Sequence, residues 1–470
     1  MAFGVAFFLL LALLFSYKII RNEGYLKLPW FFAGILFFPT QVVLFNKPLI
    51  MSFPRLMIFV LFFTLLFQKK YKWKLRFAEF PIRGGLFFIT LMLFLIGFFD
   101  IRIELAQRFI RPFIYFLENF APLFLTYLCV RRIEEFEYLT KFLLYTFVVF
   151  CVYGMLNYFT QVNEFHQFIS QTYNSTDMAN LNMAAGIERS RVSSFAFHAI
   201  YYGFLLTIIF LLHLFSTLTF SFTKKRKLFS GSLIALILIN LILVNSRTPL
   251  FSLGLGLLIF FIWGLKPKQK LRVAIVSLVA LTIVGTVMPN SSKLVSATLE
   301  TFSSDGASGS EYETGSSSFE MREMQMAASF LIFNNSPILG NGFNYIVEGL
   351  GYSSDRDKRR SDPILGGFES YSYKLLIEQG LCGILGNLVL FASLFSYFIK
   401  NARAGYNQAN GNKLAIISTS MLVVFITFIF GTGDMGSFLF FMSVMGINIK
   451  TIALYREQLR ALSPPVEQSS

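Results

Sequence analysis

Long apolar runs recur along the whole chain and constrain its fold more than any other feature. Of the 470 residues, 55% are hydrophobic and only 14% are charged, whereas a soluble chain carries roughly a quarter charged residues. Many runs reach the ~18–20 residues that a helix needs to cross about 30 Å of hydrocarbon. A membrane β-barrel would instead show alternating segments of about 10 residues. The sequence therefore predicts an all-α polytopic membrane protein.

Run length predicts about twelve to thirteen transmembrane helices. They fall near residues 3–20, 29–46, 51–67, 84–100, 109–130, 138–160, 196–220, 228–245, 248–265, 271–289, 373–399, 414–432 and 436–454. Pro39, Thr40 and Gln41 interrupt the second of these runs. We therefore expect that segment to be kinked or re-entrant.

The distribution of positive charge predicts the orientation. The net charge is +15, but the basic residues cluster in short loops such as "QKKYKWKLR", "VRRIEE" and "TKKRK", which all fall on one side of the predicted spans. Cytoplasmic loops of membrane proteins carry such an excess. Anionic lipid is the expected partner of these charges, and nucleic acid is not.

This orientation divides the chain into six parts. They are N-terminal spans (1–160), a first outer loop (161–195), further spans (196–289), a large outer loop with short helices (290–372), C-terminal spans (373–454) and a cytoplasmic tail (455–470). The start "MAFGVAFFLLLALLF" lacks a positive leader and a clear cleavage site, so we read it as a retained first helix with its N-terminus outside.

Three arginines stand out on the predicted outer side. Arg247 lies in "VNSRTPLF", a very short turn between two apolar runs, while Arg191 opens the seventh span and Arg322 heads a helical stretch of the large loop. Arg247 could be an interface arginine that reaches lipid phosphate, and the other two could be solvated loop charges. Together, three guanidinium groups on one face suit an anionic, membrane-held substrate, because arginine binds phosphate bidentately.

Two carboxylates flank the start of the eleventh span in "GGFESYSYKLLIEQGLCGILG". Glu369 stands at its mouth, where a carboxylate could act as a general base for a substrate hydroxyl. An acid at this position could equally serve only the helix dipole. Glu378 lies deeper and is interpreted as a buried structural acid.

Other polar residues give weaker indications. Asp355 and Asp357 form a D-x-D pattern on a polar loop, a pair too short to establish a metal site. Glu118 lies within an apolar run and is a functional candidate by default. The three cysteines share no ligand spacing, and neither a metal nor a nucleotide cofactor is expected.

Several motifs, in this order, resemble the bacterial O-antigen ligase and Wzy-type polysaccharide polymerase superfamily. They are "RVSSFAFHAIYYG", "NSRTPLFSLGLGLLIFF", "MREMQMAASFLIFNNSPILGNGFNY" and "ESYSYKLLIEQGLCGILG", between about residues 185 and 390. The N-terminal six spans resemble the family only in being hydrophobic. The ligases carry His where this chain has Glu369, and Glu there is similar to polymerase members.

The resemblance implies a GT-C-like membrane glycosyltransferase in the bacterial inner membrane, with its active site facing the periplasm. It implies polymerisation, in which a glycan chain moves from undecaprenyl pyrophosphate to a lipid-linked repeat unit. In that reaction Arg191, Arg247 and Arg322 would bind the pyrophosphate without a metal, and Glu369 would be the base. A chain-length regulator protein is a further expected partner. The alternatives are a ligase that uses another acceptor and a transporter or flippase for lipid-linked glycans.

Overall fold

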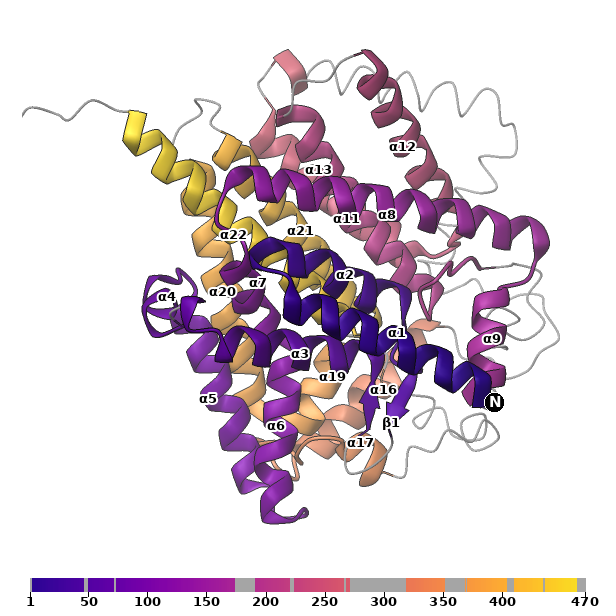
Figure 1. Ribbon diagram of the computed structural model, residues 1–470. Coiled ribbons are helices and arrows are strands. Elements are labelled where there is room, and N and C mark those ends of the chain that lie inside the picture. Colours follow the sequence, from indigo (N-terminus) through magenta and orange to yellow (C-terminus); the bar gives the residue numbers. More distant parts are fainter. Residues whose placement is uncertain are drawn as a thin grey trace, which may run out of the picture.

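The fold is described from a computed structural model of the chain (Figure 1). The structure describes residues 2–45, 50–71, 73–173, 191–219, 224–265, 268–270, 318–350, 368, 370–403, 410–433 and 436–462. Within these ranges the chain is a helical bundle with one small antiparallel hairpin, in which Val43 pairs with Ser52 and Phe45 with Met51. The chain is thus an all-α polytopic membrane protein, as its apolar runs predict.

The N-terminal half forms these elements: α1 (Ala2–Arg21), η1 (Gly24–Lys27), α2 (Leu28–Phe37), β1 (Val43–Phe45), β2 (Met51–Ser52), α3 (Phe53–Phe67), η2 (Lys69–Tyr71), α4 (Trp73–Glu79), α5 (Arg83–Phe99), α6 (Leu105–Asn119), α7 (Ala121–Cys129), α8 (Ile133–Thr160) and α9 (Glu164–Tyr173). The remaining elements are α11 (Ala199–Thr219), α12 (Lys224–Leu243), α13 (Arg247–Gly264), α16 (Ser318–Phe333), α17 (Tyr345–Glu348), α19 (Tyr371–Lys374), η3 (Leu375–Gln379), α20 (Gly380–Arg403), α21 (Asn410–Thr432) and α22 (Ser437–Leu462).

Seven described helices are long and apolar enough to cross a membrane, or up to nine if each of two bent pairs counts as one span. Several of the predicted spans are shorter or broken. The run at 29–46 becomes α2, which ends at Phe37, because Pro39 disfavours helical backbone at Phe38. The run at 109–130 divides into α6 and α7, bent by 51°. The predicted span at 271–289 lies outside the described residues, as do the tail residues from 463 onward.

The core of the bundle is formed by α11, α21 and α22. In the most apolar window of each helix, 83%, 72% and 89% of the residues are buried, against 22% for α1 and 28% for α13. Stacked aromatic rings join the core helices, for example Phe425 on Phe441 at 3.9 Å and Phe204 on Phe428 at 4.4 Å. The helices α1 and α13 therefore lie at the periphery, where their apolar side chains face outward.

Three contacts join segments that the charge pattern places on the outer side. The start of α1 meets α9, with Phe8 and Phe168 rings 5.6 Å apart. The segment after Arg191 meets the end of α12 through a hydrogen bond from Val192 N to Leu243 O, 3.3 Å. The loop between α5 and α6 meets the large loop near Phe343, as the next section describes. These contacts agree with the predicted placement of those segments on one side.

Candidate functional site

The helix that starts the predicted eleventh span is irregular at its beginning. The glycine loop of the predicted large outer loop pairs with this irregular part through backbone hydrogen bonds. The π-helix η3 separates α19 from α20, and Gly380 follows it with φ +58°. The amides of Asn341 and Gly342 donate to the carbonyls of Ile377 and Glu378, both at 2.9 Å. A widened turn leaves helix carbonyls without their usual partners, and the glycine loop supplies new ones.

Backbone hydrogen bonds also run in the opposite direction, from the start of α20 to the glycine loop. The amides of Leu381 and Cys382 donate to Pro337 O and Ile338 O, both at 2.9 Å. A side chain on Gly380 would clash with the backbone of Gly340, and Gly380 also has a left-handed φ. Two motifs far apart in the sequence therefore meet by direct backbone pairing, which we call the glycine lock (residues 337–342 with 377–382).

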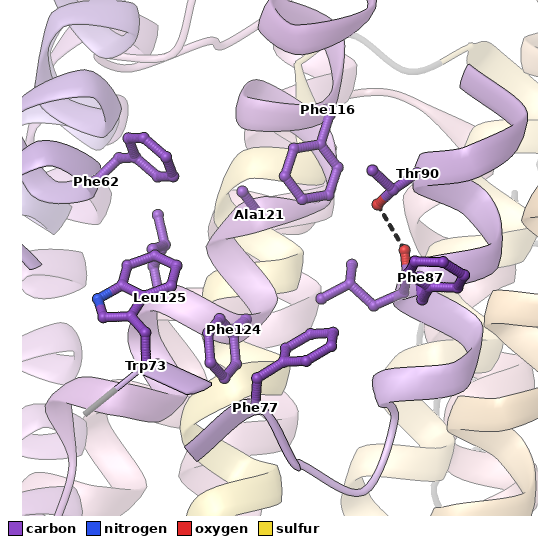
Figure 2. A pocket seen from close by; sticks show the side chains of 10 residues that line it. Phe62, Trp73, Phe77, Phe87, Thr90, Phe116, Ala121, Phe124 and Leu125 are labelled. Atoms are coloured by element: carbon purple, nitrogen blue, oxygen red, sulfur yellow. Dashed lines mark hydrogen bonds between the residues drawn. The ribbon is translucent and has the colours of Figure 1, made fainter. Parts of the chain in front are cut away.

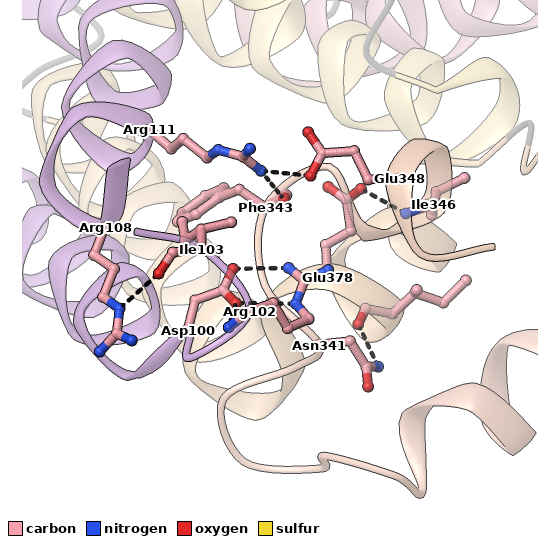
Figure 3. Close-up of polar contacts among 11 residues, drawn as sticks. Asp100, Arg102, Ile103, Arg108, Arg111, Asn341, Phe343, Ile346, Glu348 and Glu378 are labelled. Carbon is pink, nitrogen blue, oxygen red and sulfur yellow. Dashed lines mark hydrogen bonds and ion pairs between the residues drawn. The ribbon is translucent and has the colours of Figure 1, made fainter. Parts of the chain in front are cut away.

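A second element, the loop between α5 and α6, clamps the glycine lock from the side (Figure 3). Arg102 forms a bidentate pair with the buried Asp100, with Nη2–Oδ2 2.7 Å and Nε–Oδ1 2.9 Å. Its guanidinium lies 5.0 Å from the ring centroid of Tyr345. A side chain at Gly342 would clash with the Asp100 carboxylate. The lock thus packs directly on an ion pair supplied by the N-terminal half.

Arg111, in the first half of α6, holds the segment that follows the lock. Its Nη1 donates to Phe343 O at 3.1 Å and pairs with Glu348 at 2.9 Å. Glu378 is buried and accepts a hydrogen bond from Ile346 N at 3.2 Å. Sequence reasoning placed Glu378 as a buried structural acid, and its contact is to the short helix α17. Arg111 and Glu378 therefore hold α17 from two sides.

A pair of tyrosines, Tyr115 of α6 and Tyr371 of α19, joins these two helices. The hydroxyls of Tyr115 and Tyr371 are 3.1 Å apart, and Tyr371 donates to Asn387 Oδ1 at 3.4 Å. Lys374 Nζ lies 5.8 Å from the Tyr115 ring. Ser370 caps α19 by accepting from Ser372 N at 3.3 Å. Glu369 itself lies outside the described residues, but Ser370, its neighbour in the chain, is buried and fixed.

The structure brings the Arg191 and Arg247 segments together. Both arginines are exposed. The hydrogen bond from Val192 N to Leu243 O joins the non-helical stretch after Arg191 to the end of α12, which precedes Arg247 in the chain. Asn163 Nδ2 donates to Ser194 O at 2.7 Å, which anchors this stretch to the connection between α8 and α9. Burial, with the charge of Arg191 second, lowers the pKa of His198 to about 4.

Arg247 also lies at the same end of the bundle as α19. It begins α13, and a side chain at Gly431, near the end of α21, would meet Thr248 at 3.0 Å. The first turn of the next helix, α22, holds Phe438, whose ring lies 5.0 Å from that of Tyr371. The start of α13 thus contacts the end of α21, and α19 contacts the start of α22.

The third predicted arginine is on a helix that contacts the lock. Arg322 lies in α16, which packs against η3, but its side chain is outside the described residues. Met326 and Phe330, which share its face by spacing, are 46% and 49% exposed, whereas Gln325 and Ser329 are buried. The pattern Asp355–Asp357 also lies outside the described residues.

Glu118, a functional candidate by position, is paired in the structure. Both of its carboxylate oxygens bind the Arg55 guanidinium, with Nη2–Oε2 3.1 Å, at the start of α3. A charge inside a membrane is costly unless it finds such a partner. The pair ties α3 to α6 and gives Glu118 a structural role. Across the described ranges, no group of three or more His, Cys, Asp or Glu could hold a metal ion.

Sequence reasoning missed the residues from the N-terminal half. A signal was present: "DIRIELAQRFIRPF" places Arg102, Arg108 and Arg111 on the predicted outer side, against the trend for positive charge. The π-helix and the tyrosine pair had no signal of this kind, because both depend on contacts between distant segments.

Comparison with known families locates the same region. Residues 231–388 match the family model described as O-antigen ligase. The matched stretch holds Arg247, Arg322 and Glu369 together with both halves of the glycine lock, whereas Arg191 and the clamp of the α5–α6 loop lie outside it. No curated protein matches the chain. Over residues 231–388, therefore, this multi-pass membrane protein is similar to the O-antigen ligase family, in agreement with the resemblance seen in its motifs.

Proposed function

We propose that the protein is a polysaccharide polymerase that acts at the outer face of the bacterial inner membrane. It transfers a glycan chain from undecaprenyl pyrophosphate to a lipid-linked repeat unit. The observation that carries the proposal is the glycine lock, in which Asn341 and Gly342 pair with Ile377 and Glu378. It fixes η3, which directly follows α19, within the stretch that matches the family and holds Glu369.

The chemistry assigned to these residues follows from the reaction. The acceptor hydroxyl oxygen forms a bond to the anomeric carbon of the donor sugar, and the bond from that carbon to the pyrophosphate oxygen breaks. Glu369 takes the hydroxyl proton. The leaving pyrophosphate gains negative charge, which Arg191, Arg247 and Arg322 stabilise as preorganised donors. A single displacement inverts the anomeric centre, by analogy with single-displacement glycosidases.

Preorganisation is the reason to expect the supporting contacts to matter. Arg247 begins a helix whose first turn packs on α21, and the Arg191 segment is hydrogen bonded through Val192 to the end of α12, just before Arg247. Donors that are held in place lose little freedom when charge develops on the leaving group. The same logic applies to α19, which Ser370 caps and Tyr371 anchors.

The principal alternative is an O-antigen ligase, which passes the glycan to another acceptor. Glu369 in place of the ligase histidine favours polymerisation, because Glu there is similar to polymerase members. The base role is kept, since a carboxylate can accept a proton as a histidine does. A transporter or flippase is favoured less, because the intramembrane acid Glu118 is engaged by Arg55. Transporters use paired broken helices and charges near the midplane as their working site.

The decisive experiment uses purified full-length protein, a lipid-linked repeat unit and a readout of glycan length. We expect Glu369→Gln to reduce chain extension by about 10²–10⁴-fold, and Arg247→Ala to reduce it by about 10²–10³-fold. Arg403→Ala, an exposed arginine in the last turn of α20 at the opposite end of that helix, is the matched control and should keep normal activity. Normal extension by Glu369→Gln would remove the base from the mechanism.

Cells that lack the protein separate the three functions. Loss of a polymerase leaves single repeat units on the surface. Loss of a ligase leaves long chains that remain on the lipid carrier. Loss of a flippase leaves no surface glycan at all, and that result would overturn the proposal.

A further inference from the structure

An apolar pocket lies at the flank of the bundle, and its lining residues take no part in the site described above. Its volume is ≈ 200 Å³, and it is enclosed by α3, α4, α5 and the bend between α6 and α7 (Figure 2). The pocket is lined mainly by aromatic rings, those of Phe62, Trp73, Phe77, Phe87, Phe116 and Phe124. The one hydroxyl in its wall, Thr90 Oγ1, donates to Leu86 O at 2.6 Å, so the lining offers no polar group to a ligand.

One wall of the pocket is a short helix that lies across the membrane-spanning direction. The segment 69–79, which contains α4, turns by 96° from α5. If α5 crosses the membrane, α4 therefore runs along its surface. Trp73 and Phe77 are spaced i, i+4 and both line the pocket, whereas Leu75 is 61% exposed. A helix with aromatic residues on its inner face is typical of the membrane interface.

The stretch that leads into this short helix carries a dense positive charge in the sequence, of which Lys72 and the Lys74 side chain lie outside the described residues. Five of the eight residues in "KKYKWKLR" (69–76) are basic. Lys70 pairs with Glu23 at 2.5 Å and Arg76 lies 3.5 Å from Glu79. By formal charge the segment keeps a positive excess after these two pairs. A basic segment at an apolar opening is complementary to a ligand with an anionic head and an apolar tail.

From these observations we propose that this pocket is a binding site for an anionic phospholipid. One acyl chain enters the pocket beside α4, and the phosphate headgroup lies against η2 and α4, which carry Lys69, Lys70 and Arg76. A cavity of about 150 Å³ is enough to hold benzene, so the pocket has room for part of an acyl chain. The proposal is independent of the proposed glycan transfer, because it concerns the opposite, basic end of the bundle.

The test measures lipid retention by native mass spectrometry on the full-length, detergent-purified protein. The probes are phosphatidylglycerol and phosphatidylcholine with identical acyl chains. We expect the wild-type protein to retain one phosphatidylglycerol with a preference of about tenfold or more, because each basic residue near an anionic surface contributes several-fold. Equal retention of phosphatidylcholine would overturn the proposal.

Two kinds of variant locate the site. Thr90→Leu and Ala121→Leu fill the pocket, while Lys69→Gln/Lys72→Gln/Lys74→Gln removes charge without filling it. All three should lose the retained lipid by about tenfold or more. The matched controls are Leu91→Phe, on the exposed face of α5, and Lys400→Gln/Arg403→Gln, at the basic end of α20, and both should retain it.

The remaining outcomes also decide the question. If the pocket-filling variants retain phosphatidylglycerol as the wild type does, the pocket is not the site. If undecaprenyl phosphate displaces phosphatidylglycerol at lower concentration, the pocket belongs to the carrier lipid and the proposal fails. A filling variant that does not fold, as judged by its melting temperature, leaves the charge variant to give the answer.

Discussion

Two regions of this bundle satisfy their backbone polar groups in opposite ways. In the core formed by α11, α21 and α22, the helices are regular and nearly fully buried. Their polar side chains, such as Ser418 and Thr419, donate to carbonyls one turn back at 2.7 and 2.9 Å. At the glycine lock, by contrast, the helix is interrupted by η3, and the freed groups pair with a loop.

The difference shows where the chain accepts irregular backbone. Non-helical backbone at membrane depth survives only when protein buries it or when it lines a cavity. The lock meets this condition through Asp100 and Arg102 from the α5–α6 loop and Arg111 from α6. We therefore interpret the regular core as a scaffold, and the lock as part of the proposed functional site.

The sharpest test of this comparison sets a glycine substitution in the lock against one inside a regular helix. Gly380→Ala should abolish activity and lower stability by about 1–3 kcal/mol, because it forces a left-handed residue against the backbone of Gly340. Gly254→Ala is the control, since Gly254 lies inside α13 with nothing within 4 Å of an added methyl group. Thermal unfolding and glycan extension should separate the two variants, and equal behaviour would deny the lock a special role.

We expect an intermediate loss of activity and stability when Arg111, which holds the segment after the glycine lock, is replaced. Arg111→Ala removes the contacts to Phe343 O and Glu348 and leaves a buried carbonyl without its donor, at a cost of about 1–3 kcal/mol. We expect slower chain extension and a lower melting temperature. Arg108→Ala is the matched control, because Arg108 donates only within its own neighbourhood, to Ile103 O at 3.2 Å and Phe98 O at 3.5 Å. If the contacts of Arg111 have no function, Arg111→Ala and Arg108→Ala should show equal activity.

The smallest effect is expected in the regular core. Asn448 Nδ2 donates to Ser418 Oγ at 3.0 Å, which joins α22 to α21. Ser418→Ala should cost about 0.6 kcal/mol, the average for a side-chain hydrogen bond between membrane helices. Its glycan extension should equal that of the wild type. A loss of activity as large as that of Arg111→Ala would show that the core is not a passive scaffold.

Much of the scaffold was predictable from local sequence. Apolar run length located most helices, for example α8, α11 and α21, within a few residues. The prediction failed where a run does not fix a helix. Pro39 ended α2 early, and Phe120 marks the bend between α6 and α7. The last helix continues to Leu462, past the predicted end at 454, because helical backbone does not have to stop where the apolar run stops.

The candidate site was predictable only in part. The motif order singled out Arg191, Arg247, Arg322 and Glu369, and the structure joins the segments of the first two through Val192 and Leu243. It gave no role to Asp100, Arg102 or Arg111, since the N-terminal spans resemble the family only in hydrophobicity. It also left Glu118 as a functional candidate, until Arg55 appeared beside it in space.

The sequence by itself determined the class of protein and the approximate position of most helices, because both follow from the solubility of short segments in lipid or water. The tertiary structure alone decided which segments meet. A loop near Asn341, a broken helix near Ile377 and an ion pair at Asp100 come from separate parts of the chain, and each completes the hydrogen bonds or fills the space of another. Such contacts depend on complementary backbone geometry, which no short stretch of sequence encodes.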